Sequence, residues 1–173
     1  MTGEPTADTE TTVHPGAGMF VMVSGTFYRG VDPSFASAAL DGSRSAGRYS
    51  PADAPTLYLS SSREGVTVAM STYMPSKTSD LLVLGFEVDA ERIADLRDPS
   101  AREQFGVSLA DAHGDWQGAI QRGASPKSWR VRDELERQGA VGLIDPSKLQ
   151  PGLWHLVLFA WNSQGGPTVV PVE

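Results

Sequence analysis

The chain has 173 residues and a formal net charge of −7, which fits one acidic domain of ordinary size. It contains no cysteine, which excludes disulfides, thiolate metal sites and cysteine nucleophiles. An acidic surface repels phosphate backbones, so nucleic acid is not expected as a partner. The three histidines lie far apart in the sequence, so we expect no metal site.

Targeting signals are not found in the sequence. No apolar run approaches the ~20 residues that span a bilayer, and the N-terminus lacks a basic stretch followed by an apolar core. We therefore expect no contact with a membrane and a cytoplasmic location. Residues 1–18 are rich in Thr, Glu, Gly and Pro, which predicts a disordered leader ahead of a single domain over residues 19–173.

The first half of the domain alternates extended and helical patterns. Apolar residues fall at positions i, i+3, i+4 and i+7 from Val66, which predicts an amphipathic helix. In chain order we expect a strand or hairpin at 19–31, a helical or irregular stretch at 32–40, a loop at 41–55, a strand at 56–60 and a helix from Ser61 or Ser62 to about Tyr73.

The second half adds strands and helices without a regular βαβ alternation. Ser125-Pro126 is a helix start signal and Gly139 a helix stop signal. We expect a strand at 81–89, a helix at 108–120 weakened by two glycines, a helix from 125 to 139, and strands at 141–145, 153–161 and 168–172. This mixture predicts an α+β fold with a twisted mixed sheet flanked by helices.

Three short segments carry residues suited to ligand binding. Tyr28-Arg29-Gly30 ends a predicted strand, where an arginine can bind phosphate through two parallel donors. Gly47-Arg48-Tyr49-Ser50-Pro51 is a loop that could clasp a polar ligand, and Asp145-Pro146-Ser147 leaves a serine at a strand end. A solvated arginine, an ordinary turn and a capping serine explain the same residues without a ligand. Nothing in the sequence places His113 or His155 beside a serine, so a Ser-His-Asp triad is not predicted.

Taken in order, these segments resemble the RES domain, a family related to ADP-ribosyltransferases and named for its arginine, glutamate and serine. The resemblance covers about residues 27–162. Its motifs match Tyr28-Arg29, Gly47-Arg48-Tyr49-Ser50-Pro51, Leu57-Tyr58-Leu59-Ser60, Asp95-Leu96-Arg97-Asp98-Pro99, Asp115-Trp116, Ser128-Trp129, the segment 139–147 that ends in Asp145-Pro146-Ser147, and His155-Leu156-Val157-Leu158-Phe159.

The resemblance implies a toxin of a toxin–antitoxin pair that consumes NAD by phosphorolysis, hydrolysis or ADP-ribosyl transfer. NAD is then the ligand, an antitoxin protein is a partner, no metal is needed, and a homo-oligomer is left open. The catalytic residues it suggests are Arg29, Ser147 and Glu64. The ligand-binding residues are Tyr28, Arg29, Gly47, Arg48, Tyr49, Tyr58, Ser147 and His155, which stands where the family pattern has an asparagine.

One motif residue departs from the family pattern. The glutamate expected about eleven residues after Tyr58 falls on Ala69, and an alanine cannot stabilise a sugar cation. Three interpretations follow: another acid such as Glu64 or Glu87 serves in an NAD-consuming enzyme; the pocket acts on a different nucleotide or ribosylated metabolite; or the domain is a pseudoenzyme that binds a nucleotide or a protein without turnover.

Overall fold

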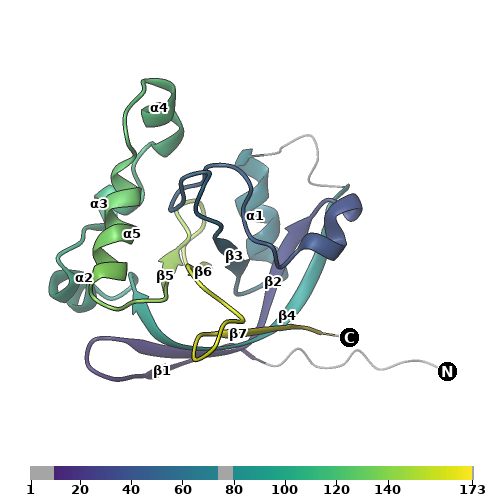
Figure 1. The fold of residues 1–173 in the computed structure, drawn as a ribbon, viewed down its shortest axis with the longest axis horizontal. Coiled ribbons are helices and arrows are strands. Elements are labelled where there is room, and N and C mark those ends of the chain that lie inside the picture. The colour runs from purple at the N-terminus through teal and green to yellow at the C-terminus, as the bar shows by residue number, and fades with distance from the viewer. Residues whose placement is uncertain (1–9, 74–79, 173) are drawn as a thin grey trace.

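A computed structural model describes residues 10–73 and 80–172 of the chain. The elements, shown in Figure 1, are strands β1 (Thr12–Pro15), β2 (Val21–Val31), β3 (Leu57–Ser60), β4 (Leu82–Asp95), β5 (Gly142–Pro146), β6 (Trp154–Leu158) and β7 (Thr168–Pro171), a 3-10 helix η1 (Pro33–Ala38), and helices α1 (Arg63–Tyr73), α2 (Pro99–Phe105), α3 (Leu109–Ala112), α4 (Trp116–Gln121) and α5 (Lys127–Arg137). No helix in these ranges is long and apolar enough to cross a membrane.

The strands form one mixed sheet that closes on itself. Its order is β1-β2-β3-β6-β5-β4-β7, and an additional pairing joins β2 to β4. β4 and β5 run parallel, and the other neighbouring strands run antiparallel. The β2–β4 pairing makes a ring of β2, β3, β6, β5 and β4, with β1 and β7 as outer strands. This is the α+β fold with a mixed sheet that the sequence predicts.

Alternating side chains divide the apolar residues between two cores. Leu57 and Leu59 of β3 belong to one buried cluster, whereas Tyr58 packs against the other. The second cluster joins the sheet to α2, α3 and α5 through residues such as Phe105 and Leu135. In Figure 1, α1 lies on one side of β3, β6 and β5, and the group α2, α3 and α5 lies on the other. The face of these three strands that carries Tyr58, called the outer face below, is the one on which α2, α3 and α5 pack.

The predicted elements differ from the observed ones in several places. Thr12–Pro15 pairs with β2 as strand β1, so the prediction of disorder up to residue 18 is wrong for this segment, because a strand edge supplies the hydrogen bonds that its polar composition did not suggest. Residues 1–9 lie outside the described part. The helix predicted at 108–120 is two helices, because Asp115 caps a new one with its side chain on the N–H of Gly118. Helix α2 was not predicted, although Asp98 caps its start and the left-handed Gly106 ends it.

Candidate functional site

The segment Gly47–Ser50 is fixed by helix α5. Three successive backbone carbonyls accept hydrogen bonds from this helix: Gly47 from Trp129 Nε1 at 2.9 Å, Arg48 from the Ser128 hydroxyl, and Tyr49 from Arg132 Nη1 at 3.1 Å. Two motifs far apart in the sequence, the 47–51 loop and Ser128-Trp129, thus form a single structural unit.

The side chain of Tyr58 locks this loop to strand β3. Its hydroxyl accepts a hydrogen bond from the Tyr49 N–H at 3.0 Å and lies 2.8 Å from the Ser50 hydroxyl. Gly47 permits the approach, because a Cβ at this position would lie 2.8 Å from the Tyr58 hydroxyl. The hydroxyl of Tyr58 is therefore used by the protein itself, while its half-buried ring borders the site.

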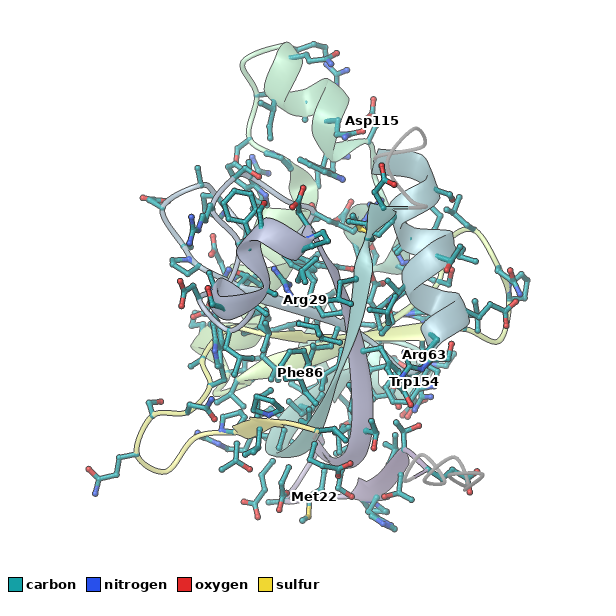
Figure 2. All side chains as sticks on the ribbon, turned by 90° about the vertical axis from the view of Figure 1, so that its right-hand side faces the viewer. Met22, Arg29, Arg63, Phe86, Asp115 and Trp154 are labelled. Carbon is teal, nitrogen blue, oxygen red and sulfur yellow. The ribbon has the colours of Figure 1, made fainter. Side chains whose placement is uncertain are left out.

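Arg29 lies near the point where β2 and β3 meet. The only register pair between these strands is Tyr28 with Ser60, and Arg29 Nη1 donates to the backbone carbonyl of Tyr58 at 3.2 Å. Among the described residues, its Nε is buried and has no hydrogen-bond partner. Burial lowers the pKa of Arg29 from its ordinary value. Figure 2 shows it inward of the outline of the molecule. A buried guanidinium with an unused donor is suited to an anionic ligand group.

Arg48 is engaged with the protein. Its Nη1 donates to the carbonyls of Ala112 at 3.2 Å and Gly114 at 3.0 Å, at the end of α3. Arg29 and Arg48 are linked through Tyr58, since one binds the carbonyl of Tyr58 and the other stands in the loop that binds its hydroxyl. The structure therefore brings Arg29 to the backbone of Tyr58, whereas one donor atom of Arg48 positions the end of α3.

A row of polar side chains crosses the outer face of the sheet. Ser60 on β3, His155 on β6 and Asp145 on β5 stand opposite one another in register. The Ser60 hydroxyl lies 2.9 Å from His155 Nδ1, and Asp145 Oδ1 lies 2.7 Å from Nε2 of His113, which follows α3. The sequence reasoning missed Ser60, Asp145 and His113 as site residues. Strand register brings them together, and no motif in the sequence indicates it.

Burial shifts the pKa of two side chains in this region, His155 and Tyr49. It lowers the pKa of His155, His113 lowers it further, and the carboxylate of Asp145 opposes both effects. Burial also raises the pKa of Tyr49 well above its ordinary value, and Asp145 is the next cause. Tyr49 was predicted to bind the ligand. It is fully buried, so it lies in the wall behind the site.

Ser147 and Glu64 meet through the loop that joins β5 and β6. The Ser147 hydroxyl accepts from the Gln150 N–H at 3.2 Å, and the side-chain amide of Gln150 donates to Glu64 at 3.0 Å. The backbone N–H of Ser147 is taken by the Leu153 carbonyl at 2.8 Å. Glu64 lies in the first turn of α1 and is exposed, and its hydrogen bond from Gln150 places this predicted carboxylate beside the loop that carries the predicted serine.

Ala69 and Glu87, the other two residues considered in connection with the family glutamate, lie away from this loop. Ala69 is partly buried in α1, a helix that faces β2 with Val66 and Met70 against Gly30. Glu87 accepts a hydrogen bond from Thr26 and borders a groove between β1 and β7. Among the described residues, no group of three or more histidines or carboxylates is placed to hold a metal ion.

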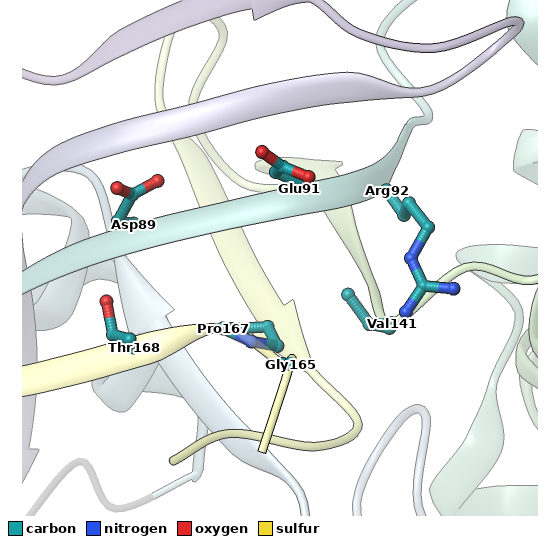
Figure 3. A pocket seen from close by; sticks show the side chains of 8 residues that line it. Asp89, Glu91, Arg92, Val141, Gly165, Pro167 and Thr168 are labelled. Carbon is teal, nitrogen blue, oxygen red and sulfur yellow. The ribbon is translucent and has the colours of Figure 1, made fainter. Parts of the chain in front are cut away.

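The best-formed hollow lies away from these residues. It measures about 290 Å³ between β4 and the loop before β7, where Figure 3 shows Asp89, Glu91 and Arg92. A neighbouring groove of about 420 Å³ is lined by Glu10, Glu87 and Asp89 among others. None of the predicted ligand residues lines either hollow. Both carry more carboxylates than cations, which disfavours a pyrophosphate there.

Comparison with known proteins identifies the class. The model of the RES domain family matches residues 26–172, and the chain belongs to this family. Among solved structures, the chain is similar to one in the toxin–antitoxin complex MbcT–MbcA of M. tuberculosis, with a TM-score of 0.61 and 18% sequence identity over 95% of this chain and 85% of that one. At this identity the likeness extends to the fold. No curated protein matches the chain.

Proposed function

We propose that the chain is an NAD-consuming enzyme that cleaves the bond between nicotinamide and ribose. Membership of the RES family supports the substrate class. The observation that carries the proposal is the unused buried donor of Arg29, held beside a tyrosine that is fixed by the other family motifs. A guanidinium placed in this way can bind a phosphate of the dinucleotide and fix the ribose for reaction.

The chemistry requires a negative group near the sugar. The bond breaks through a cation-like ribose, which a carboxylate stabilises in a site shielded from water. Two carboxylates are linked to predicted site residues: Glu64 to the Ser147 loop through Gln150, and Asp145 to His155 by strand register. Glu64 is exposed and, within the described part of the chain, accepts only the hydrogen bond from Gln150, whereas Asp145 is buried and bonded to His113.

The test is release of nicotinamide from NAD by the purified protein, with and without inorganic phosphate. We expect steady release, faster with phosphate if the reaction is a phosphorolysis. The variant Arg29→Ala should release none above background, whereas Arg130→Ala, on the exposed face of α5, should behave as the unsubstituted protein.

A second candidate is a pseudoenzyme that binds a nucleotide without turnover. Ala69 favours it, because this residue stands where the family pattern has its glutamate. The engagement of Arg48 with α3 favours it too, since one fewer donor remains for phosphate. Calorimetric binding of NAD without nicotinamide release would establish this candidate, and turnover of another nucleotide but not NAD would indicate a changed substrate.

We also propose a toxin role with an antitoxin partner. The similar solved structure is of a toxin with its antitoxin, and this supports the same arrangement here. Production of the chain in bacteria should arrest growth, and the variant Arg29→Ala should not. Rescue by the product of a neighbouring gene would identify the partner.

A further inference from the structure

His155 lies on strand β6, where neighbouring strands hold its backbone and Ser60 holds its side chain. It pairs with Ser60 of β3 on one edge and Asp145 of β5 on the other. Its Nδ1 lies 2.9 Å from the Ser60 hydroxyl. Because Ser60 is buried, this contact fixes the plane of the imidazole ring.

The second ring nitrogen of His155 is available. Within residues 10–73 and 80–172, no hydrogen bond to Nε2 is formed. In the same part of the chain, the buried side-chain nitrogens and oxygens without a partner are Arg29 Nε and the Tyr49 hydroxyl. Nε2 is not among them, so the protein does not fully enclose this unpaired nitrogen.

The titratable groups around the imidazole ring of His155 suit a general base. Burial lowers the pKa of His155, so the ring is neutral at neutral pH and can accept a proton. The charged and titratable groups that act on it are Asp145 on β5 and His113 after α3. The carboxylate of Asp145 favours the imidazolium that forms when His155 is protonated. The hydrogen bond between Asp145 and His113 holds this carboxylate in place.

We propose that His155 is the general base that activates a hydroxyl acceptor for attack on the ribose. The inference rests on the proposed function. The bond between nicotinamide and C1′ breaks with its electron pair leaving on nicotinamide. The acceptor oxygen forms a bond to C1′ and its proton passes to His155 Nε2. With water as acceptor, the products are nicotinamide and an ADP-ribose whose released proton returns to solvent.

The acceptor determines how much the base matters. Water and protein hydroxyls must lose a proton as they attack, so they need a base. Inorganic phosphate near neutral pH already carries an ionised oxygen and can attack without one. His155 should therefore control hydrolysis and hydroxyl transfer, and contribute little to phosphorolysis.

The experiment compares the unsubstituted protein with His155→Asn, in which the shorter side chain can keep the contact to Ser60 but has no Nε2. Nicotinamide release is measured without phosphate and with saturating phosphate, from pH 5 to 9. We expect hydrolysis to fall about 100-fold in the variant, and phosphorolysis to change less than about three-fold. Hydrolysis by the unsubstituted protein should decrease as acid protonates the ring, and the residual rate of the variant should not follow this decrease.

Free imidazole supplies a second measurement, because it can replace the missing base and should raise hydrolysis by the variant. Equal hydrolysis by the two proteins, or an equal loss with both acceptors, would overturn the inference while leaving the proposed function intact. Absence of nicotinamide release from the unsubstituted protein under every condition would overturn both. Retention of the melting temperature of the unsubstituted protein shows that a loss of rate is not a loss of fold.

Discussion

Two regions of this molecule could receive a ligand, and they differ in how they are built. The first surrounds Tyr58 and His155 on the outer face of β3, β6 and β5, where loop, strand and helix are joined by hydrogen bonds between distant motifs. The second is the hollow of about 290 Å³ between β4 and the loop before β7, which is lined by Asp89, Glu91 and Arg92 among others.

This difference shows that a hollow with space for a ligand and the side chains suited to bind that ligand can lie in different parts of the molecule. The hollow has space, but Asp89 and Glu91 give it a charge that repels phosphate. The polar region has a half-buried histidine with one unpaired ring nitrogen and residues from most of the family motifs, and the partly buried Arg29, whose Nε has no partner among the described residues, binds the backbone carbonyl of Tyr58. For an anionic dinucleotide, charge and donors decide, so we place the site at the polar region.

The largest effect on nicotinamide release is expected from substituting the arginine of one region, and the arginine of the other region serves as the comparison. Arg29→Ala should lower nicotinamide release by about 1,000-fold, because it removes the donor that would stabilise charge in the transition state. Arg92→Ala removes an exposed arginine from the hollow and should change the rate less than two-fold. Both are measured as kcat/KM, with melting temperatures as the control for folding. A larger loss from Arg92→Ala than from Arg29→Ala would place the site in the hollow.

The next effect concerns the support beneath the site. Arg132 is buried and donates to the Tyr49 carbonyl at 3.1 Å and to the Thr56 hydroxyl at 2.7 Å. Arg132→Met should lower the free energy of unfolding by about 3 kcal/mol, since it leaves buried acceptors without a charged donor. Arg130→Met, on the exposed face of the same helix, should change it by less than about 0.5 kcal/mol. Urea denaturation measures both, and equal values would show that α5 does not hold the loop.

A smaller effect appears at alkaline pH. Burial raises the pKa of Tyr49, so the folded protein keeps a proton that the unfolded chain loses above about pH 10. Stability should therefore fall as pH rises above 10, by about 1.4 kcal/mol for each pH unit from this group. Tyr49→Phe should remove that part of the fall. A pH dependence that is identical in the variant would show that Tyr49 ionises as easily in the folded protein.

The smallest effect is expected from the carboxylates of the hollow. The double substitution Asp89→Asn and Glu91→Gln keeps size and removes two exposed charges. Nicotinamide release and the affinity for ADP-ribose should change less than about two-fold, because exposed charges at a distance are screened by salt. A marked gain in ADP-ribose affinity would show that the hollow accepts the nucleotide once its repulsion is removed.

The sequence predicts much of the fold because its signals are local. The Val66 stripe gives α1, the Pro126 and Gly139 signals give α5, and the apolar run at 81–89 gives most of β4. Strand β1 was missed because its pairing with β2, and not its composition, makes it a strand. The segment after residue 89 extends β4 through a bend at Arg92, where φ is 57°.

The site could be predicted only in part for the same reason. Motif residues such as Arg29 and Tyr58 are visible in the sequence, and the structure joins them. The partnership of Ser60 with His155, and of Asp145 with His113, depends on the register of three strands and on the end of α3. These contacts join residues far apart in the chain, so no local pattern could show them.

A crystal structure with ADP-ribose tests the location of the site most directly. We predict electron density beside Tyr58, with a phosphate oxygen within hydrogen-bonding distance of Arg29 and the ribose C1′ facing His155 Nε2. Density in the hollow between β4 and β7, with Arg29 still bound to the Tyr58 carbonyl and its Nε without a partner, would contradict it.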